Sequence, residues 1–138
     1  MPFELRGVTT LLQVYDMPTS VRFYRDVLGF SIVNTSPPLG GDDRFHWVWL
    51  RRENIDLMLN TAYEDDDERP SSPHPARFSA HDDTCLYFGC PDVDAAYEDL
   101  LAKNITVSKP TVAAYGMKQL YFHDPDGYHL CLQWSAKN

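Results

Sequence analysis

The side chains best suited to chemistry in this chain are its three cysteines and five histidines. Cys85, Cys90 and Cys131 contain no C-x-x-C pair and are odd in number, so they predict neither a zinc ribbon nor a framework of disulfides. The histidines form no H-x-H or H-x-x-x-H pair, a spacing that would bring two imidazoles to one metal ion. The spacing of these residues therefore does not indicate a metal centre.

Aromatic side chains form a second set of candidates. Phe45, Trp47 and Trp49 alternate along one segment, which predicts a β-strand with three rings on one face. Such a face can stack on a planar ligand or attract a cationic one. The same pattern is equally typical of a core or a dimer interface, and the sequence leaves these alternatives open.

Two stretches with the same order of elements must position these side chains. Each reads as strand, helix and three further strands, from hydrophobic periodicity and turn residues. Asp16 and Pro18 are suited to capping and opening the first helix. The elements predicted for the first stretch are residues 8–14, 20–28, 30–34, 44–50 and 55–60. Those predicted for the second are residues 84–89, 93–101, 105–107, 117–123 and 128–134.

The segment between the two stretches has almost nothing to bury. Residues 61–83 contain the acidic run Glu64-Asp-Asp-Asp-Glu68 and the run Pro70-Ser-Ser-Pro-His-Pro75. This composition predicts a linker, which is either a solvated loop or a lid over a pocket. We therefore expect a single domain over residues 1–138, with modules at 7–60 and 84–135 joined by the linker 61–83.

Composition limits the class of protein. The chain has 138 residues, a hydrophobic fraction of 43% and an aromatic fraction of 13%, as expected for a packed globular domain. Its net charge of −8 disfavours binding to nucleic acid, whose phosphates call for a basic surface. No apolar run approaches the roughly 18 residues of a membrane span, and the first residues do not form a signal peptide. With its odd number of cysteines, the chain is predicted to be cytoplasmic.

Two motifs carry a resemblance to a known family. Phe23-Tyr-Arg-Asp-Val-Leu-Gly-Phe30 follows the first strand, and Phe122-His-Asp-Pro-Asp-Gly-Tyr128 precedes the last. Together with the repeat, they resemble the vicinal oxygen chelate superfamily, which includes glyoxalase I, extradiol dioxygenases, fosfomycin-resistance enzymes and bleomycin-resistance proteins. The resemblance implies an α+β fold of two βαβββ modules whose curved mixed sheets carry a concave cavity. It also implies a homodimer.

Metal-using members of that superfamily place His, Gln or Glu at four positions. The resemblance puts these positions at Thr9, Asp56, Cys85 and Cys131 in this chain. One alcohol, one carboxylate and two thiols suit neither Fe(II) nor the usual Ni(II) or Mg(II) sites, although zinc could accept two thiolates and a carboxylate. We therefore expect no metal and no cofactor.

Strand alternation from those four positions predicts which side chains line the cavity. The concave face is expected to be partly polar and partly apolar, as ligand pockets are. Tyr115, in a loop before a strand, is a candidate gate. Asp56 is expected to have a raised pKa or a cationic partner, with Arg44 and Lys118 as candidates. The predicted ligand-binding residues are Phe45, Trp47, Trp49, Asp56, Met58, Tyr87, Tyr115, His129 and Cys131.

Three functions compete at this point. The first is a metal-free, bleomycin-resistance-like protein that binds a small planar or cationic molecule in the cavity. The second is a lyase or isomerase acting next to a carbonyl, either metal-independent or with an atypical metal site. Its catalytic candidates are Asp56 or His129 as general base and Tyr87 as acid. The third is a structural or regulatory protein without a small ligand. Whether the chain is an enzyme stays open.

Overall fold

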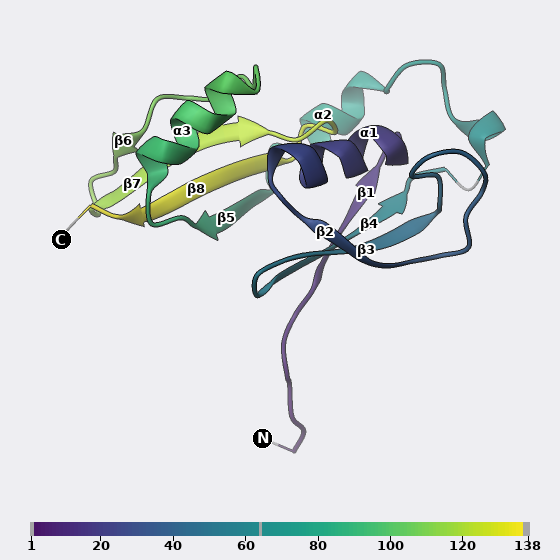
Figure 1. The fold of residues 1–138 in the computed structure, drawn as a ribbon, viewed down its shortest axis with the longest axis horizontal. Helices are drawn as coiled ribbons and strands as arrows, with labels where there is room; N and C mark the ends of the chain where they lie inside the picture. Colours follow the sequence, from purple (N-terminus) through teal and green to yellow (C-terminus); the bar gives the residue numbers. More distant parts are fainter. Residues whose placement is uncertain (1, 64, 137–138) are drawn as a thin grey trace. The chain divides into compact units, whose positions relative to one another are not determined.

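In the computed structural model, which describes residues 2–63 and 65–136, eight strands form two four-stranded sheets (Figure 1). The first sheet contains β1 (Thr10–Val14), β2 (Ser31–Thr35), β3 (Trp47–Arg52) and β4 (Ile55–Thr61). The second contains β5 (Cys85–Gly89), β6 (Thr111–Val112), β7 (Met117–His123) and β8 (His129–Ser135). The helices are α1 (Met17–Arg22), α2 (Pro75–Ala80) and α3 (Val93–Ala102). A π-helical turn (Phe23–Val27) continues α1, and a 3-10 turn (Asp66–Glu68) lies in the predicted linker.

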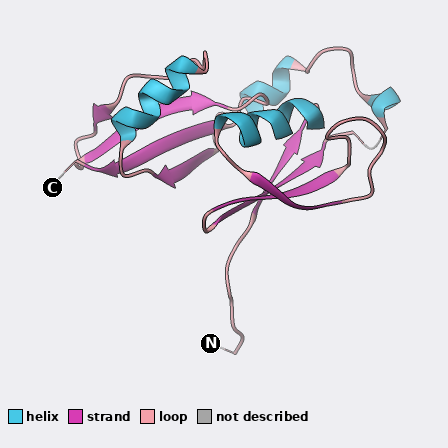
Figure 2. Cartoon of the chain, in the orientation of Figure 1, coloured by secondary structure: helices cyan, strands magenta, loops and turns pink. Residues whose placement is uncertain are grey.

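The two sheets have the same topology. The strand orders are β1-β4-β3-β2 and β5-β8-β7-β6, and in each sheet the first pair is parallel and the other pairs are antiparallel. Figure 2 distinguishes the helices from the strands by colour. This repeat confirms the predicted α+β fold of two βαβββ modules. The chain divides into two compact units between Pro70 and Ser71.

One helix covers one face of each sheet. α1 contacts β4 within the first unit, and α3 contacts β7 and β8 within the second (Figure 1). Both helices begin at an aspartate, since Asp16 accepts a bond from Thr19 N at 3.2 Å and Asp92 accepts one from Ala95 N at 3.0 Å. An N-cap of this kind satisfies one of the backbone donors that a helix leaves unpaired.

The predicted apolar face of the first helix is confirmed by burial. Val21, Tyr24 and Leu28 are buried against the first sheet, together with alternate residues of its strands. In the second helix only part of the predicted face is buried. Val93 and Leu100 are buried, whereas Leu101 is exposed. The buried strand residues of the helix-facing sides are Leu12, Val14, Val48, Leu50, Leu57, Leu59, Leu120, Phe122 and Leu130.

The structure corrects the strand predicted at residues 105–107. The short strand that pairs with β7 is β6, at Thr111–Val112. Asn104 has a φ of 61° as the chain leaves α3, and Pro110 has no N–H to donate to a ladder. Before that proline, Ser108 bonds to β7 from its N to Tyr121 O at 3.0 Å and accepts from Tyr121 N at its Oγ at 2.9 Å.

The second half of the predicted linker belongs to the second unit. α2 is held on the turn before β8, where Arg77 Nη1 lies 2.8 Å from Oδ1 of Asp126, a carboxylate that is 3% exposed. His81 stacks on Tyr128 with 3.8 Å between ring centroids, and Phe78 packs beside Gly127. Residues 75–80 are therefore an anchored helix and not a free linker. In the acidic run 64–68, Glu64 lies outside the described residues.

None of the helices in the described part of the chain combines the length and apolar character that a membrane span needs.

Candidate functional site

The side of the first sheet opposite its buried residues is the first candidate surface, which we call the first face. Cross-strand pairing places Trp47, Trp49 and Arg51 of β3 directly opposite Asn60, Met58 and Asp56 of β4. On the other side of β4, Leu11 pairs with Met58 and Gln13 with Asn60. The first face thus consists of Leu11, Gln13, Trp47, Trp49, Arg51, Asp56, Met58 and Asn60.

Three residues of the first face are joined by polar contacts. Asp56 Oδ1 accepts bonds from Trp49 Nε1 at 2.9 Å and from Arg51 Nε at 2.8 Å. The guanidinium carbon of Arg51 lies 4.9 Å from the centre of the Trp49 ring. The bond from Trp49 and then that from Arg51 lower the pKa of Asp56. The carboxylate is therefore ionised at neutral pH and holds the indole and the guanidinium in place.

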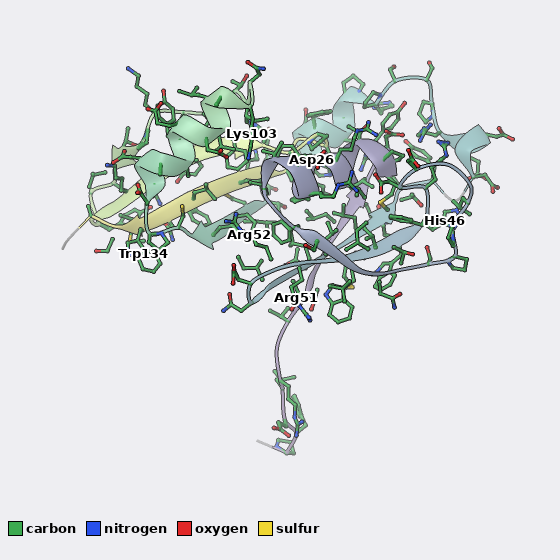
Figure 3. The ribbon with its side chains drawn as sticks, in the orientation of Figure 1. Asp26, His46, Arg51, Arg52, Lys103 and Trp134 are labelled. Atoms are coloured by element: carbon green, nitrogen blue, oxygen red, sulfur yellow. The ribbon has the colours of Figure 1, made fainter. Side chains whose placement is uncertain are left out.

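Neither Arg44 nor Lys118, the two predicted cationic partners, is the one that pairs with Asp56. A cationic side chain does pair with this carboxylate, but it is Arg51, which Figure 3 labels in the first unit. Lys118 instead donates to Asp94 Oδ2 at 2.5 Å, and Arg44 lines a pocket away from this group. The prediction ended the strand at residue 50, whereas β3 runs to Arg52, so Arg51 was missed. Extending the hairpin register by one residue would have placed Arg51 opposite Asp56.

Phe45 lies outside the alternating strand. It is buried, precedes β3 and lines a small pocket, partly open to solvent, near the start of α1. The chain has turned away from the strand geometry at this point, so the alternation that joined Phe45 to Trp47 and Trp49 does not hold. The pocket is lined by Met17, Pro18, Leu39, Arg44, Phe45, His46, Thr61, Tyr63 and Arg69.

The corresponding side of the second sheet is the second face. Tyr87 of β5, Cys131 of β8 and Tyr121 of β7 form one cross-strand row, and Gln133 and Gln119 form part of the next. The rings of Tyr87 and Tyr121 meet edge to face with 6.4 Å between centroids. The second face consists of Cys85, Tyr87, Gln119, Tyr121, His123, His129, Cys131 and Gln133, with Tyr115 from the loop before β7.

A buried amide organises hydrogen bonds on the second face. Gln119, which is 5% exposed, donates from Nε2 to Tyr115 Oη at 2.8 Å and to Gln133 Oε1 at 2.9 Å. Its Oε1 accepts from Tyr121 Oη at 3.2 Å. Sequence reasoning missed Gln119 and Tyr121, although Met117, Gln119 and Tyr121 alternate along a strand that had been predicted. Applying the alternation rule to that strand would have found them.

The thiols of this face are poor ligands and poor nucleophiles at neutral pH. Cys131 is 0% exposed between the two tyrosines, and its burial raises the pKa of the thiol to about 11. Burial also raises the pKa of Cys85. Because a thiol reacts and ligates as the thiolate, both groups are held in the unreactive form. The structure thus makes Cys131 part of the packed floor of the face and not an exposed contact residue.

Histidines occupy one end of the second face. Cys85, His129 and His123 are cross-strand neighbours, and the two imidazoles lie 4.4 Å apart between centroids. His129 Nε2 lies 3.3 Å from Asp82 Oδ1. Asp82 can therefore orient the imidazole of His129, the arrangement that a histidine base requires.

Sequence comparison assigns the chain to a family. The sequence model of the Glyoxalase/Bleomycin resistance protein/Dioxygenase superfamily matches residues 7–132. The chain belongs to this superfamily. The match covers both modules and the segment between them, which confirms the resemblance drawn from the two motifs. No curated protein sequence matches the chain significantly.

Solved structures of this superfamily's fold resemble the chain along nearly its whole length. The protein SMU.1112c is 27% identical, with a TM-score of 0.73, and the match covers 95% of this chain and 100% of that one. A bleomycin-binding protein in complex with bleomycin is 19% identical, with a TM-score of 0.67 and coverage of 95% and 99%. TnmS3, an antibiotic-binding protein from Streptomyces sp. CB03234, is 21% identical, with a TM-score of 0.65 and coverage of 96% and 99%.

The superfamily's metal positions do not fit a metal ion in this chain. Asp56 already accepts two bonds within the first face, and the thiols of Cys85 and Cys131 have raised pKa values. Thr9 offers only a hydroxyl, which is a weak ligand for a divalent metal. In residues 2–63 and 65–136, no three His, Cys, Asp or Glu side chains are grouped so that they could hold a metal.

Proposed function

We propose that this superfamily member is a small-molecule-binding protein that holds a planar ligand against its sheet faces without a metal ion. The observation that carries the proposal is the open aromatic surface of the first face, where Asp56 holds the indole of Trp49 in a defined position. A ring fixed before binding loses little further freedom when a ligand stacks on it. The bleomycin-binding protein and TnmS3 support the proposal by analogy of fold.

The charge of the ligand is the finer question. A cationic ligand was one expectation, drawn from the acidic chain and from Asp56. Arg51 pairs with that carboxylate at 2.8 Å, so the local charge on the first face is already balanced. A planar ligand therefore needs no positive charge to bind here.

The test uses indole N–H resonances of the 15N-labelled chain, which has three tryptophans. We expect planar probes such as 2-naphthol and N-methylquinolinium to shift the resonances of Trp47 and Trp49. Trp134 is an internal control, because its side chain lies on the side of β8 opposite the second face. Trp47→Ala should weaken binding on the order of fivefold to tenfold, as loss of an aromatic contact does. Unchanged affinity in both Trp47→Ala and Trp49→Ala would remove the first face from the proposal.

One observation favours a second candidate function, a metal-independent lyase or isomerase. The contact between His129 and Asp82 is suited to a general base, whereas Asp56, with its lowered pKa, is a weak one. If His129 removes protons next to a carbonyl, the chain should catalyse exchange of the α-protons of 1-indanone for deuterium. His129→Gln should abolish that exchange, and exchange at the uncatalysed rate in the unaltered protein would reject the enzyme.

Assembly and location complete the proposal. We infer a homodimer, in keeping with the superfamily resemblance and with the exposed apolar side chains of residues 2–9. We also infer a reducing compartment, the cytoplasm, because the cysteines are odd in number and contain no C-x-x-C pair.

A further inference from the structure

The hydrogen-bond network of the second face has a direction. Gln119 Nε2 has two hydrogens. It donates one to Tyr115 Oη and the other to Gln133 Oε1. Tyr115 Oη and Gln133 Oε1 are therefore acceptors in these bonds. Each partner keeps its own donor, namely the Tyr115 O–H and the Gln133 Nε2 hydrogens.

Those donors have no acceptor within residues 2–63 and 65–136. The hydroxyl of Tyr115 and the side-chain nitrogen of Gln133 make no bond to a described acceptor, apart from the contacts with Gln119. Tyr115 is 70% exposed and Gln133 is half-buried, so both donors are open to solvent. Two donors whose side chains are held by the same buried amide are preorganised for an acceptor oxygen.

The surroundings of the donors select the rest of the ligand. Tyr87 is 53% exposed, and its ring meets that of Tyr121 edge to face, which supplies an aromatic wall on the same face. The network itself contains only amides, hydroxyls and a buried thiol, and Lys118 is engaged by Asp94. The surface therefore suits a neutral aromatic group carrying an oxygen acceptor.

We propose that the second face binds an aromatic carbonyl compound, with the carbonyl oxygen accepting bonds from Tyr115 Oη and Gln133 Nε2. Gln119 is the positioning residue, since it orients both donors without touching the ligand. The inference rests on the proposed function and names the class of ligand. It adds Gln119, Gln133 and Tyr121 to the site.

The test compares 1-indanone with indane, its parent hydrocarbon, on the 15N-labelled full-length chain. The side-chain NH₂ resonances of Gln133 report on the second face, and the indole resonances of Trp47 and Trp49 report on the first. We expect 1-indanone to bind about tenfold more tightly than indane, because its carbonyl oxygen accepts two hydrogen bonds that indane cannot make. Its titration should shift the Gln133 resonances.

Three variants sharpen the comparison. Tyr115→Phe removes only a hydroxyl from an exposed side chain and should abolish most of the preference for the ketone. Tyr97→Phe makes the same change on α3 and should leave the preference intact. Gln119→Glu removes both donated hydrogens, so the Tyr115 hydroxyl turns toward residue 119 and the preference should again be lost. A thermal melt establishes that this variant is folded.

The outcomes separate this inference from the proposed function. Equal affinity for indane and 1-indanone, with shifts at either face, would overturn the carbonyl site and leave the binding function standing. A ketone preference that survives both Tyr115→Phe and Gln119→Glu would also overturn the site. If neither probe shifts a resonance of either face, both the inference and the proposed function fail.

Discussion

At the scale of single residues, Asp56 has a role different from the one its position suggested. Its Oδ1 atom accepts from both Trp49 and Arg51, which lowers its pKa. A general base near neutral pH would need a raised pKa. Asp56 instead fixes the geometry of an aromatic side chain and a guanidinium on the first face.

We predict that Arg51→Gln raises the pKa of Asp56 toward its ordinary value, measured from the carboxyl 13C shift during an acid titration. Because this pKa is lowered in the folded state, its contribution to stability is present above the unfolded-state value and is lost as pH falls through the folded value. The free energy of unfolding of Arg51→Gln should therefore decrease less than that of the parent protein as the pH is lowered. Arg52→Gln is the matched control, since Arg52 donates to the backbone oxygen of Leu28 at 2.9 Å. An Asp56 pKa that is unchanged in Arg51→Gln would contradict the assignment.

At the scale of elements, α2 was not foreseen. Its residues are mostly exposed, so they show little apolar periodicity, and its six residues are too few to be stable alone. The helix is held by distant groups, chiefly the carboxylate of Asp126 and the ring of Tyr128. Local sequence carries no sign of such partners.

We predict that Asp126→Asn destabilises the protein by about 3 kcal/mol, because it removes the buried carboxylate charge that pairs with Arg77. Lys103→Met is the control, since Lys103 makes an exposed pair with Asp99 on α3 and its loss should change stability by less than about 1 kcal/mol. Urea unfolding measures both changes. Hydrogen exchange should also show faster exchange of the α2 amides in Asp126→Asn. Equal effects of the two variants would refute the anchoring role of Asp126.

At the scale of the whole molecule, the segment before β1 exposes apolar side chains that a packed protein would bury. Residues 2–9 form no helix or strand (Figure 1), and the side chains of Phe3, Leu5 and Val8 are 63%, 82% and 94% exposed. Exposed apolar groups in sequence commonly mark an interaction surface. A second copy of the chain is the partner that the inferred homodimer supplies.

We predict a dimer by sedimentation velocity, and a shift toward monomer when Phe3, Leu5 and Val8 are all changed to serine. The physical reason is the loss of apolar area that the dimer would remove from water. The control variant changes Leu39 and Leu101 to serine, since both are exposed apolar residues outside this segment. A monomeric parent protein, or an unchanged dimer in the triple variant, would reject this role for residues 2–9.

Several features could be predicted from the sequence because they depend on local periodicity and turn chemistry. The apolar alternation of β4 and β8, the helix caps at Asp16 and Asp92 and the Asp124-Pro-Asp-Gly127 turn are each encoded within a few residues. Repeated in the same order, they also determined the duplicated module and hence the family. The register of β3 against β4 places Trp47, Trp49, Asp56 and Met58 on one face, and the alternation that does so is readable from each strand alone.

Only the tertiary structure decided how those side chains are satisfied. The pairing of Arg51 with Asp56 depends on the register of β3 against β4, and the bonds of Gln119 depend on three segments meeting on the second face. Burial between Tyr87 and Tyr121 raises the pKa of the Cys131 thiol, and Phe45 precedes β3 and lines a pocket near α1. Hydrogen-bond direction, burial and pKa are properties of neighbours in space, and a local pattern of residue types does not contain them.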